Sequence, residues 1–143
     1  MTSTIFRALL LSSLSLIIIV PAVSVHADTN VTGNWSGTFS SNHSNVAPFT
    51  IVVVINQDST TGRITGNSTL ASRCLKGAHL EVTVTGSSVV LAGSDEQGDN
   101  MTIRGSLDET GTLLNSTYIL NGSAAGACET DDGTGTLTKR KIF

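Results

Sequence analysis

The chain has 143 residues, a formal net charge of −3, 13% charged residues and 4% aromatic residues. This length allows one domain of moderate size. The sequence has no basic stripe that could follow a phosphate backbone, so we expect no nucleic-acid partner.

The first segment, residues 1–27, has the pattern of a secretory signal peptide. Arg7 supplies a positive charge, residues 8–20 form an apolar run too short to span a bilayer comfortably, and small residues precede a cut before Asp28. A membrane anchor is the alternative. Cleavage would leave one domain, residues 28–143, with seven Lys and Arg against eleven Asp and Glu. We expect no transmembrane segment after signal removal, and a secreted, periplasmic or cell-surface location.

The rest of the chain has the pattern of an all-β domain. Short alternating runs rich in Thr, Val and Ile are separated by Gly, Asn, Asp and Ser. One apolar and one polar face per strand is typical of a closed barrel or a sandwich. We predict an eight-stranded antiparallel up-and-down barrel, with a β-sandwich as the alternative. The predicted strands are 32–39, 49–56, 63–70, 79–85, 88–93, 100–107, 112–120 and 133–140.

The connections alternate in length, which predicts a disulfide. In an up-and-down barrel alternate connections lie at opposite ends, so the longer ones after the first, third and seventh strands share one mouth. Cys74 and Cys128, the two cysteines of the chain, lie in the third and seventh connections. Exported proteins usually fold in an oxidising compartment, so we predict a Cys74–Cys128 bridge, with free thiols or a metal pair as the alternative.

The interior of the predicted barrel supports two hypotheses. Eight strands enclose a space that side chains can just fill or that can hold one small ligand. One hypothesis is a carrier of a small apolar ligand. The other is a structural or surface-interaction module with a solid interior, which the low aromatic content favours because specific pockets tend to be rich in aromatic residues. The candidate ligand-lining residues are Trp35, Phe39, Ile51, Val53, Val82, Val84, Leu91, Met101 and Ile103.

Residues suited to catalysis or metal binding are few. The sequence after residue 27 contains two histidines, His43 and His79, and no G-x-S-x-G elbow, so we expect no enzyme. Two acidic groups would share the predicted mouth and offer oxygen ligands for Ca²⁺, although neither has the D-x-[DN]-x-[DN]-G spacing. We therefore expect solvated acidic loops and no metal or cofactor. The two groups are Asp95, Glu96 and Asp99, and Glu129, Asp131 and Asp132.

Asparagine is concentrated in N-x-S/T sequons, the acceptor pattern for N-glycosylation. Seven of the nine asparagines have this context, against about two or three expected by chance in a chain this rich in Ser and Thr. Strand alternation places several of them outward, where a glycan is sterically allowed, although outward positions favour Asn, Ser and Thr in any case. The seven are Asn30, Asn34, Asn42, Asn67, Asn100, Asn115 and Asn121.

A short motif at the start of the first predicted strand resembles a known family. Gly33-Asn34-Trp35 is similar to the G-x-W opening of lipocalin and avidin-type barrels, which together are called calycins. In lipocalins a basic residue of the last strand packs over this Trp, and Lys139 or Arg140 matches it. The resemblance implies an up-and-down barrel. It does not extend to biotin binding, because avidins close that site with several tryptophans and Trp35 is the single one here.

Overall fold

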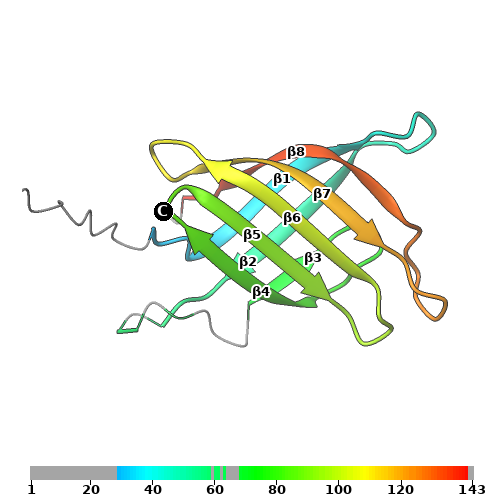
Figure 1. Ribbon diagram of the computed structural model, residues 1–143, viewed down its shortest axis with the longest axis horizontal. Coiled ribbons are helices and arrows are strands. Elements are labelled where there is room, and N and C mark those ends of the chain that lie inside the picture. The colour runs from blue at the N-terminus through cyan, green and yellow to red at the C-terminus, as the bar shows by residue number, and fades with distance from the viewer. Residues whose placement is uncertain (1–28, 59, 62, 64–67, 142–143) are drawn as a thin grey trace, which may run out of the picture.

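The computed structural model describes residues 29–58, 60–61, 63 and 68–141, which form one closed barrel (Figure 1). Each strand pairs antiparallel with the next, and β8 pairs with β1 to close the sheet. The predicted all-β, up-and-down barrel is therefore confirmed, whereas the predicted signal segment lies outside the described residues. The strands are β1 (Gly33–Ser41), β2 (Phe49–Ile55), β3 (Thr69–Ala71), β4 (Ala78–Thr85), β5 (Ser88–Ser94), β6 (Asn100–Leu107), β7 (Leu113–Asn121) and β8 (Asp131–Lys139).

Seven of the eight strands have bounds within two residues of the predicted ones. The third strand differs, because it was predicted at 63–70 and β3 spans Thr69–Ala71. Residues 64–67 of that prediction lie outside the described residues. Among the described residues no helix is long and apolar enough to cross a bilayer.

Strand alternation sorts the side chains into a buried and an outward set. In β2, Ile51, Val53 and Ile55 are buried, while Val52 between them is exposed. The tight curvature of the barrel requires small residues at some inward positions. A Cβ added at Gly135 of β8 would lie 2.5 Å from the Phe39 ring, so glycine there makes room for the aromatic side chain.

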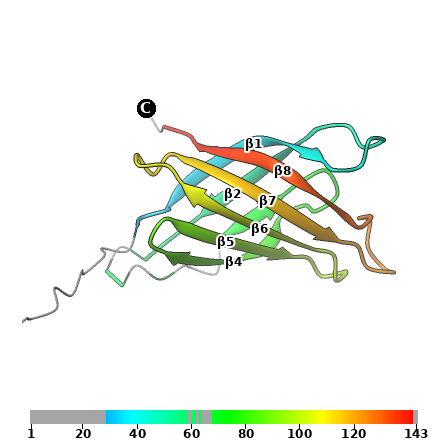
Figure 2. The ribbon, with the colours of Figure 1, turned by 45° about the horizontal axis from the view of Figure 1, so that its top comes forward.

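The connections gather at two ends of the barrel (Figures 1 and 2). The loops 42–48, 72–77, 95–99 and 122–130, here called the mouth loops, follow the odd-numbered strands and lie together at one end. The turns 86–87 and 108–112 lie at the other end, here called the base. The predicted separation holds for the longer connections at the mouth and for the short turns after β4 and β6. It is wrong for the connection after β2, which was predicted as a tight turn but runs over residues 56–68, part of which lies outside the described residues.

Trp35 closes the base. The Trp35 side chain is buried, and its Nε1 donates a hydrogen bond of 2.9 Å to the carbonyl of Val31, a buried residue that precedes β1. The Lys139 Nζ lies 5.7 Å from the centroid of the Trp35 ring, a cation–π arrangement. The predicted basic residue over the tryptophan is thus Lys139, while Arg140 donates from Nε to the Ser36 hydroxyl at 3.1 Å.

Replacing Trp35 with alanine should lower the free energy of unfolding by about 3–5 kcal/mol, because it empties the base and leaves the Val31 carbonyl without its donor. Denaturant titration measures this loss. Leu113→Ala on the outer wall, where Leu113 is 38% exposed, is the matched control and should cost about 0.5 kcal/mol or less. Equal losses in the two variants would contradict the proposed closure.

Candidate functional site

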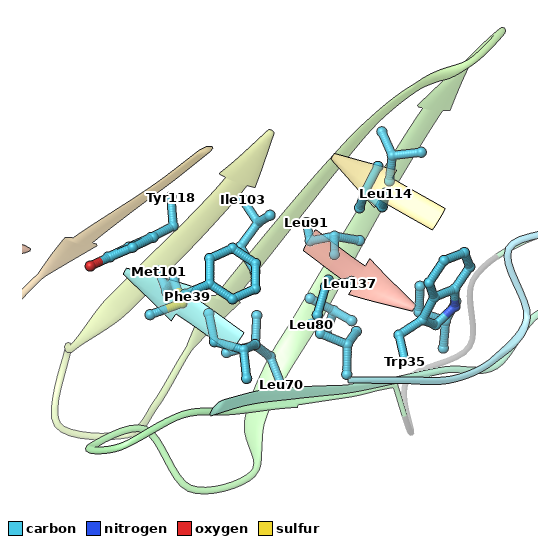
Figure 3. Close-up of a cluster of buried hydrophobic side chains, with 14 of the residues drawn as sticks. Trp35, Phe39, Leu70, Leu80, Leu91, Met101, Ile103, Leu114, Tyr118 and Leu137 are labelled. Atoms are coloured by element: carbon cyan, nitrogen blue, oxygen red, sulfur yellow. The ribbon is translucent and has the colours of Figure 1, made fainter. Parts of the chain in front are cut away.

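The predicted ligand-lining residues form the core of the barrel (Figure 3). Seven of the nine have at most 2% of their surface accessible, and Val82 and Val84 of β4 are half-buried and pack against the others. An internal cavity able to hold even one water molecule would leave its wall atoms accessible to that water. The buried residues lack such surface from Trp35 at the base to Tyr118 near the mouth. Their own side chains therefore fill the interior along this length, except beside β4, where Val82 and Val84 keep part of their surface accessible.

Loop 72–77 brings an apolar plug to the mouth end of the core. Leu75 in this loop has no accessible surface, and the Leu75 carbonyl accepts a 2.8 Å hydrogen bond from the Ser72 N–H. Cys74 beside it forms the predicted disulfide with Cys128, across a sequence separation of 54 residues. The bridge joins loop 72–77 to loop 122–130.

An aromatic layer lies below these loops. The Tyr118 ring packs edge-on against Phe39, with centroids 5.8 Å apart, and against Phe49, with centroids 5.4 Å apart. The guanidinium carbon of Arg73 lies 4.9 Å from the centroid of the Phe49 ring. Such edge-to-face and cation–π contacts add to the energy of burying the rings. The layer therefore closes the mouth end of the core.

Asp131 is a buried carboxylate at the centre of the mouth. It has 3% accessible surface and accepts a 2.7 Å hydrogen bond from the Tyr118 hydroxyl and a 2.5 Å hydrogen bond from the Ser41 hydroxyl. Arg73 Nη2 lies 2.9 Å from the same carboxylate and forms an ion pair with it. One carboxylate thus joins β1, β7, β8 and loop 72–77. A buried charge needs such partners to offset its lost hydration.

The surroundings shift the pKa values of Asp131 and of Tyr118, one of its hydrogen-bond donors. Burial raises the pKa of Asp131, but the hydrogen bonds from Ser41 and Tyr118 and the charge of Arg73 outweigh it and hold the value below the ordinary one. Burial, together with the hydrogen bond to Asp131 and its negative charge, raises the pKa of the Tyr118 phenol far above its ordinary value. Asp131 is therefore ionised and Tyr118 protonated at neutral pH.

A second buried carboxylate, Asp99, fixes loop 122–130. It accepts hydrogen bonds from the backbone N–H groups of Ser123, Ala127 and Cys128 at 2.6–3.0 Å. The bond from Ser123 is the largest of the contributions that lower the pKa of Asp99, and they outweigh the effect of burial. A Cβ added at Gly126 would lie 1.9 Å from an Asp99 oxygen, so this close approach requires glycine. Asp99 is thus part of the loop's internal frame.

The prediction that the acidic loops are solvated is wrong for two of the six residues. Asp99 and Asp131 are buried because they continue the inward alternation of β6 and β8 beyond the apolar part of each strand. Glu96 and Glu129 are exposed, and Asp95 accepts hydrogen bonds from N–H groups of its own loop. Within the described parts of the chain, His, Cys, Asp and Glu do not gather in threes as a metal site would require.

An open groove lies beside the mouth, between loop 42–48 and the mouth ends of β7 and β8. His43 and Asp132 lie on it, with the Nε2 of His43 3.1 Å from a carboxylate oxygen of Asp132. The two side chains are 58% and 50% exposed, so this is a solvated surface pair. His79, the other histidine, is exposed on β4 near loop 95–99 and lines a separate groove there. The structure thus leaves the two histidines apart.

Comparison of the chain with protein families, curated proteins and solved structures found no match.

Removing the disulfide should lower the free energy of unfolding by about 4 kcal/mol, since a bridge over a loop of this length restricts the unfolded chain by that amount in the chain-entropy relation. The Cys74→Ser/Cys128→Ser variant and denaturant titration measure the loss. Reductant should destabilise the parent protein and leave the double variant unchanged. Full thiol labelling of the unreduced, unfolded parent protein would contradict the bridge.

Asp131→Asn should lower the stability at pH 7 by about 1–3 kcal/mol, because the amide weakens the bonds to Arg73 and to the two hydroxyls. The native pKa of Asp131 is depressed, so its contribution is complete above about pH 4 and is lost as the pH falls through the folded-state value. The parent protein should therefore lose more stability than the variant between about pH 5 and pH 2.

Unfolding curves across this pH range measure the difference between the two proteins. Asp58, Asp99 and Asp108 also have lowered pKa values and are common to both proteins. Hydrogen bonds from residues close in sequence lower those of Asp58 and Asp108, and hydrogen bonds from loop 122–130 lower that of Asp99. Glu129→Gln, which changes an exposed carboxylate of loop 122–130, is the matched control and should behave like the parent protein. Parallel pH profiles for Asp131→Asn and the parent protein would show that Asp131 contributes no pH-dependent stability.

Proposed function

We propose that this chain is an exported, non-enzymatic barrel that acts through its exterior as a structural or surface-interaction module. The observation that carries the proposal is the filled interior. Most inward side chains from Trp35 to Tyr118 have almost no accessible surface, the half-buried Val82 and Val84 of β4 excepted, and Leu75 plugs the mouth end. Pockets for small molecules usually have volumes of about 300–1,000 Å³ and enclose most of their ligand. The groove that Tyr118 lines lies outside the barrel, beside loop 42–48, and is open to solvent. The packing therefore favours the solid-interior hypothesis over a carrier of an apolar ligand.

The mouth loops are the surface that we assign to contacts with a partner. The disulfide joins loop 72–77 to loop 122–130, and Asp99 joins loop 95–99 to loop 122–130. Loop 42–48 is held to β8 by the N–H of Asn42, which donates to the carbonyl of Asp132 at 2.8 Å. Loops held on a rigid scaffold commonly carry binding residues. A surface fixed in this way loses little conformational entropy when it binds.

The absence of catalysis is part of the proposal. The His43–Asp132 pair is open to water on both sides, and the His43 ring has this one hydrogen bond among the described residues. A catalytic histidine of the triad type needs a nucleophile within hydrogen-bond reach as well as a carboxylate. The His43–Asp132 pair therefore fits a solvated surface pair better than a catalytic one.

Export and kinship with calycin barrels have separate support. The disulfide is typical of an oxidising compartment, which agrees with the signal pattern of residues 1–27. The barrel order and the Lys139–Trp35 contact agree with the lipocalin resemblance. Lys139 and Trp35 both belong to the closed base. The likeness therefore concerns architecture and does not indicate a ligand.

Benzene should leave the melting temperature of the parent protein unchanged, because the interior offers it no space. Met101→Ala, which truncates a fully buried side chain of β6, is the positive control. An apolar cavity made in this way can bind benzene, so saturating benzene should raise the melting temperature of this variant. Ile103→Ala, at another fully buried position of β6, serves if Met101→Ala does not fold.

The outcome for the parent protein decides the proposal. Stoichiometric binding of benzene to the parent protein, or an apolar molecule that copurifies with it from its native source, would overturn the solid-interior function. It would restore the carrier hypothesis.

A further inference from the structure

The exterior of the barrel carries a set of sequon asparagines that the proposed role of the mouth loops does not explain. Six of the seven sequon asparagines are described, and five of these have exposed side chains. The sixth, Asn100, is half-buried. On the strands, the asparagine and the hydroxyl residue two positions later share the outward face, as Asn115 and Thr117 do on β7. The folded barrel therefore presents these acceptor motifs to solvent.

The strand pattern alone does not explain the number of sequons. Outward strand positions favour Ser and Thr, which raises the chance of a sequon at Asn34 and Asn115. Asn30 and Asn42, however, lie outside the strands, and both have a hydroxyl residue two positions later. In the Asn30 sequon, the side-chain carbonyl accepts a 2.8 Å hydrogen bond from the N–H of Thr32 and forms an Asx turn.

The outer wall has few charges. Among the outward-facing residues of the described strands, the charged side chains are Glu81, Arg104 and Asp132, and hydroxyl groups cover most of the remainder. Soluble proteins commonly have about 25–35% Lys, Arg, Glu and Asp on their surfaces. Attached sugars hydrate and shield a surface without charge. A glycan-covered wall would therefore remain soluble despite its low charge.

We propose that the exposed sequon asparagines carry N-linked glycans, with Asn34 and Asn115 as the leading sites. The Thr136 hydroxyl donates a 3.0 Å hydrogen bond to the Oδ1 of Asn115. This bond leaves the Nδ2 of Asn115, the atom that a sugar would modify, unoccupied by Thr136. Among the described residues, the side chain of Asn34 has no hydrogen-bond partner. By contrast, the Nδ2 of Asn42 donates to Asp132, and that of Asn121 to Asn100.

The donor is a lipid-pyrophosphate-linked oligosaccharide. The asparagine Nδ2 forms a bond to the anomeric carbon of the first sugar, and the bond from that carbon to the pyrophosphate oxygen breaks. The lipid pyrophosphate leaves with the electron pair, and the amide proton passes to a base of the transferring enzyme. The reaction requires the chain to enter an exporting compartment, as residues 1–27 predict.

Peptide mass spectrometry of the protein purified from the cells that make it tests the sites. Peptides with Asn34 and Asn115 should carry added masses of whole sugar units, and fragmentation should release sugar ions. Asn45 is the matched control, because it is exposed in loop 42–48 but is followed two positions later by Ala47. Recovery of the Asn34 and Asn115 peptides in unmodified form alone would overturn the proposal.

Two wall variants made in the same cells test the sequon itself. Thr117→Ala keeps Asn115 but removes the required hydroxyl, so the sugar mass at that site should be lost. Thr134→Ala changes the residue paired with Thr117 on β8 and belongs to no sequon, so its glycans should match those of the parent protein. Equal sugar mass in Thr117→Ala and Thr134→Ala would contradict N-glycosylation at Asn115.

Discussion

The small space inside an eight-stranded closed barrel is the constraint on which the rest of this structure depends. That space holds little more than one layer of inward side chains, and the alternating strands supply this layer. Gly135 leaves room for Phe39, so large and small residues share the interior. Trp35 fills the base, and Tyr118 with Phe49 fills the mouth end. We therefore assign the proposed function to the exterior.

The mouth shows how polar groups are held above such a core. The apolar layer ends at Tyr118 and Leu120, and the inward positions beside and beyond it carry the carboxylates Asp131 and Asp99. Asp131 is balanced by Arg73 and two hydroxyl groups, whereas Asp99 is balanced by backbone N–H groups of loop 122–130. Removing one partner of such a buried group leaves the other unsatisfied, which costs more than the net gain from forming the bond. The mouth loops are therefore fixed as one unit together with the disulfide.

Much of this architecture could be predicted because it follows from local alternation and from the topology of an up-and-down barrel. The strand count and the two ends depend on nothing else, and the Cys74–Cys128 bridge also required the expectation of an oxidising compartment. A basic residue over Trp35 was predicted from the family resemblance as either Lys139 or Arg140, and the structure shows that it is Lys139. The third strand was harder to predict, because Ser68 continues the alternation but lies outside β3, while Ala71 belongs to it.

The buried carboxylates were missed because an acidic residue in a loop resembles a solvated one. Their position in the alternation was nevertheless visible. Asp99 has the parity of Met101, and Asp131 that of Leu137, so each continues the inward face of its strand. Their partners could not be predicted, since Arg73 and Ser123 come from other parts of the chain. Whether the core is solid also depends on three-dimensional packing, because the same alternation could surround a cavity.

A high-resolution experimental structure of the protein purified from its native source tests the central claim most directly, through the density inside the barrel. The filled interior predicts only the side chains of the core between Trp35 and Tyr118, in contact with one another. Density for a bound molecule between them, or a continuous cavity of about 300 Å³ or more, would contradict the account and make the barrel a carrier.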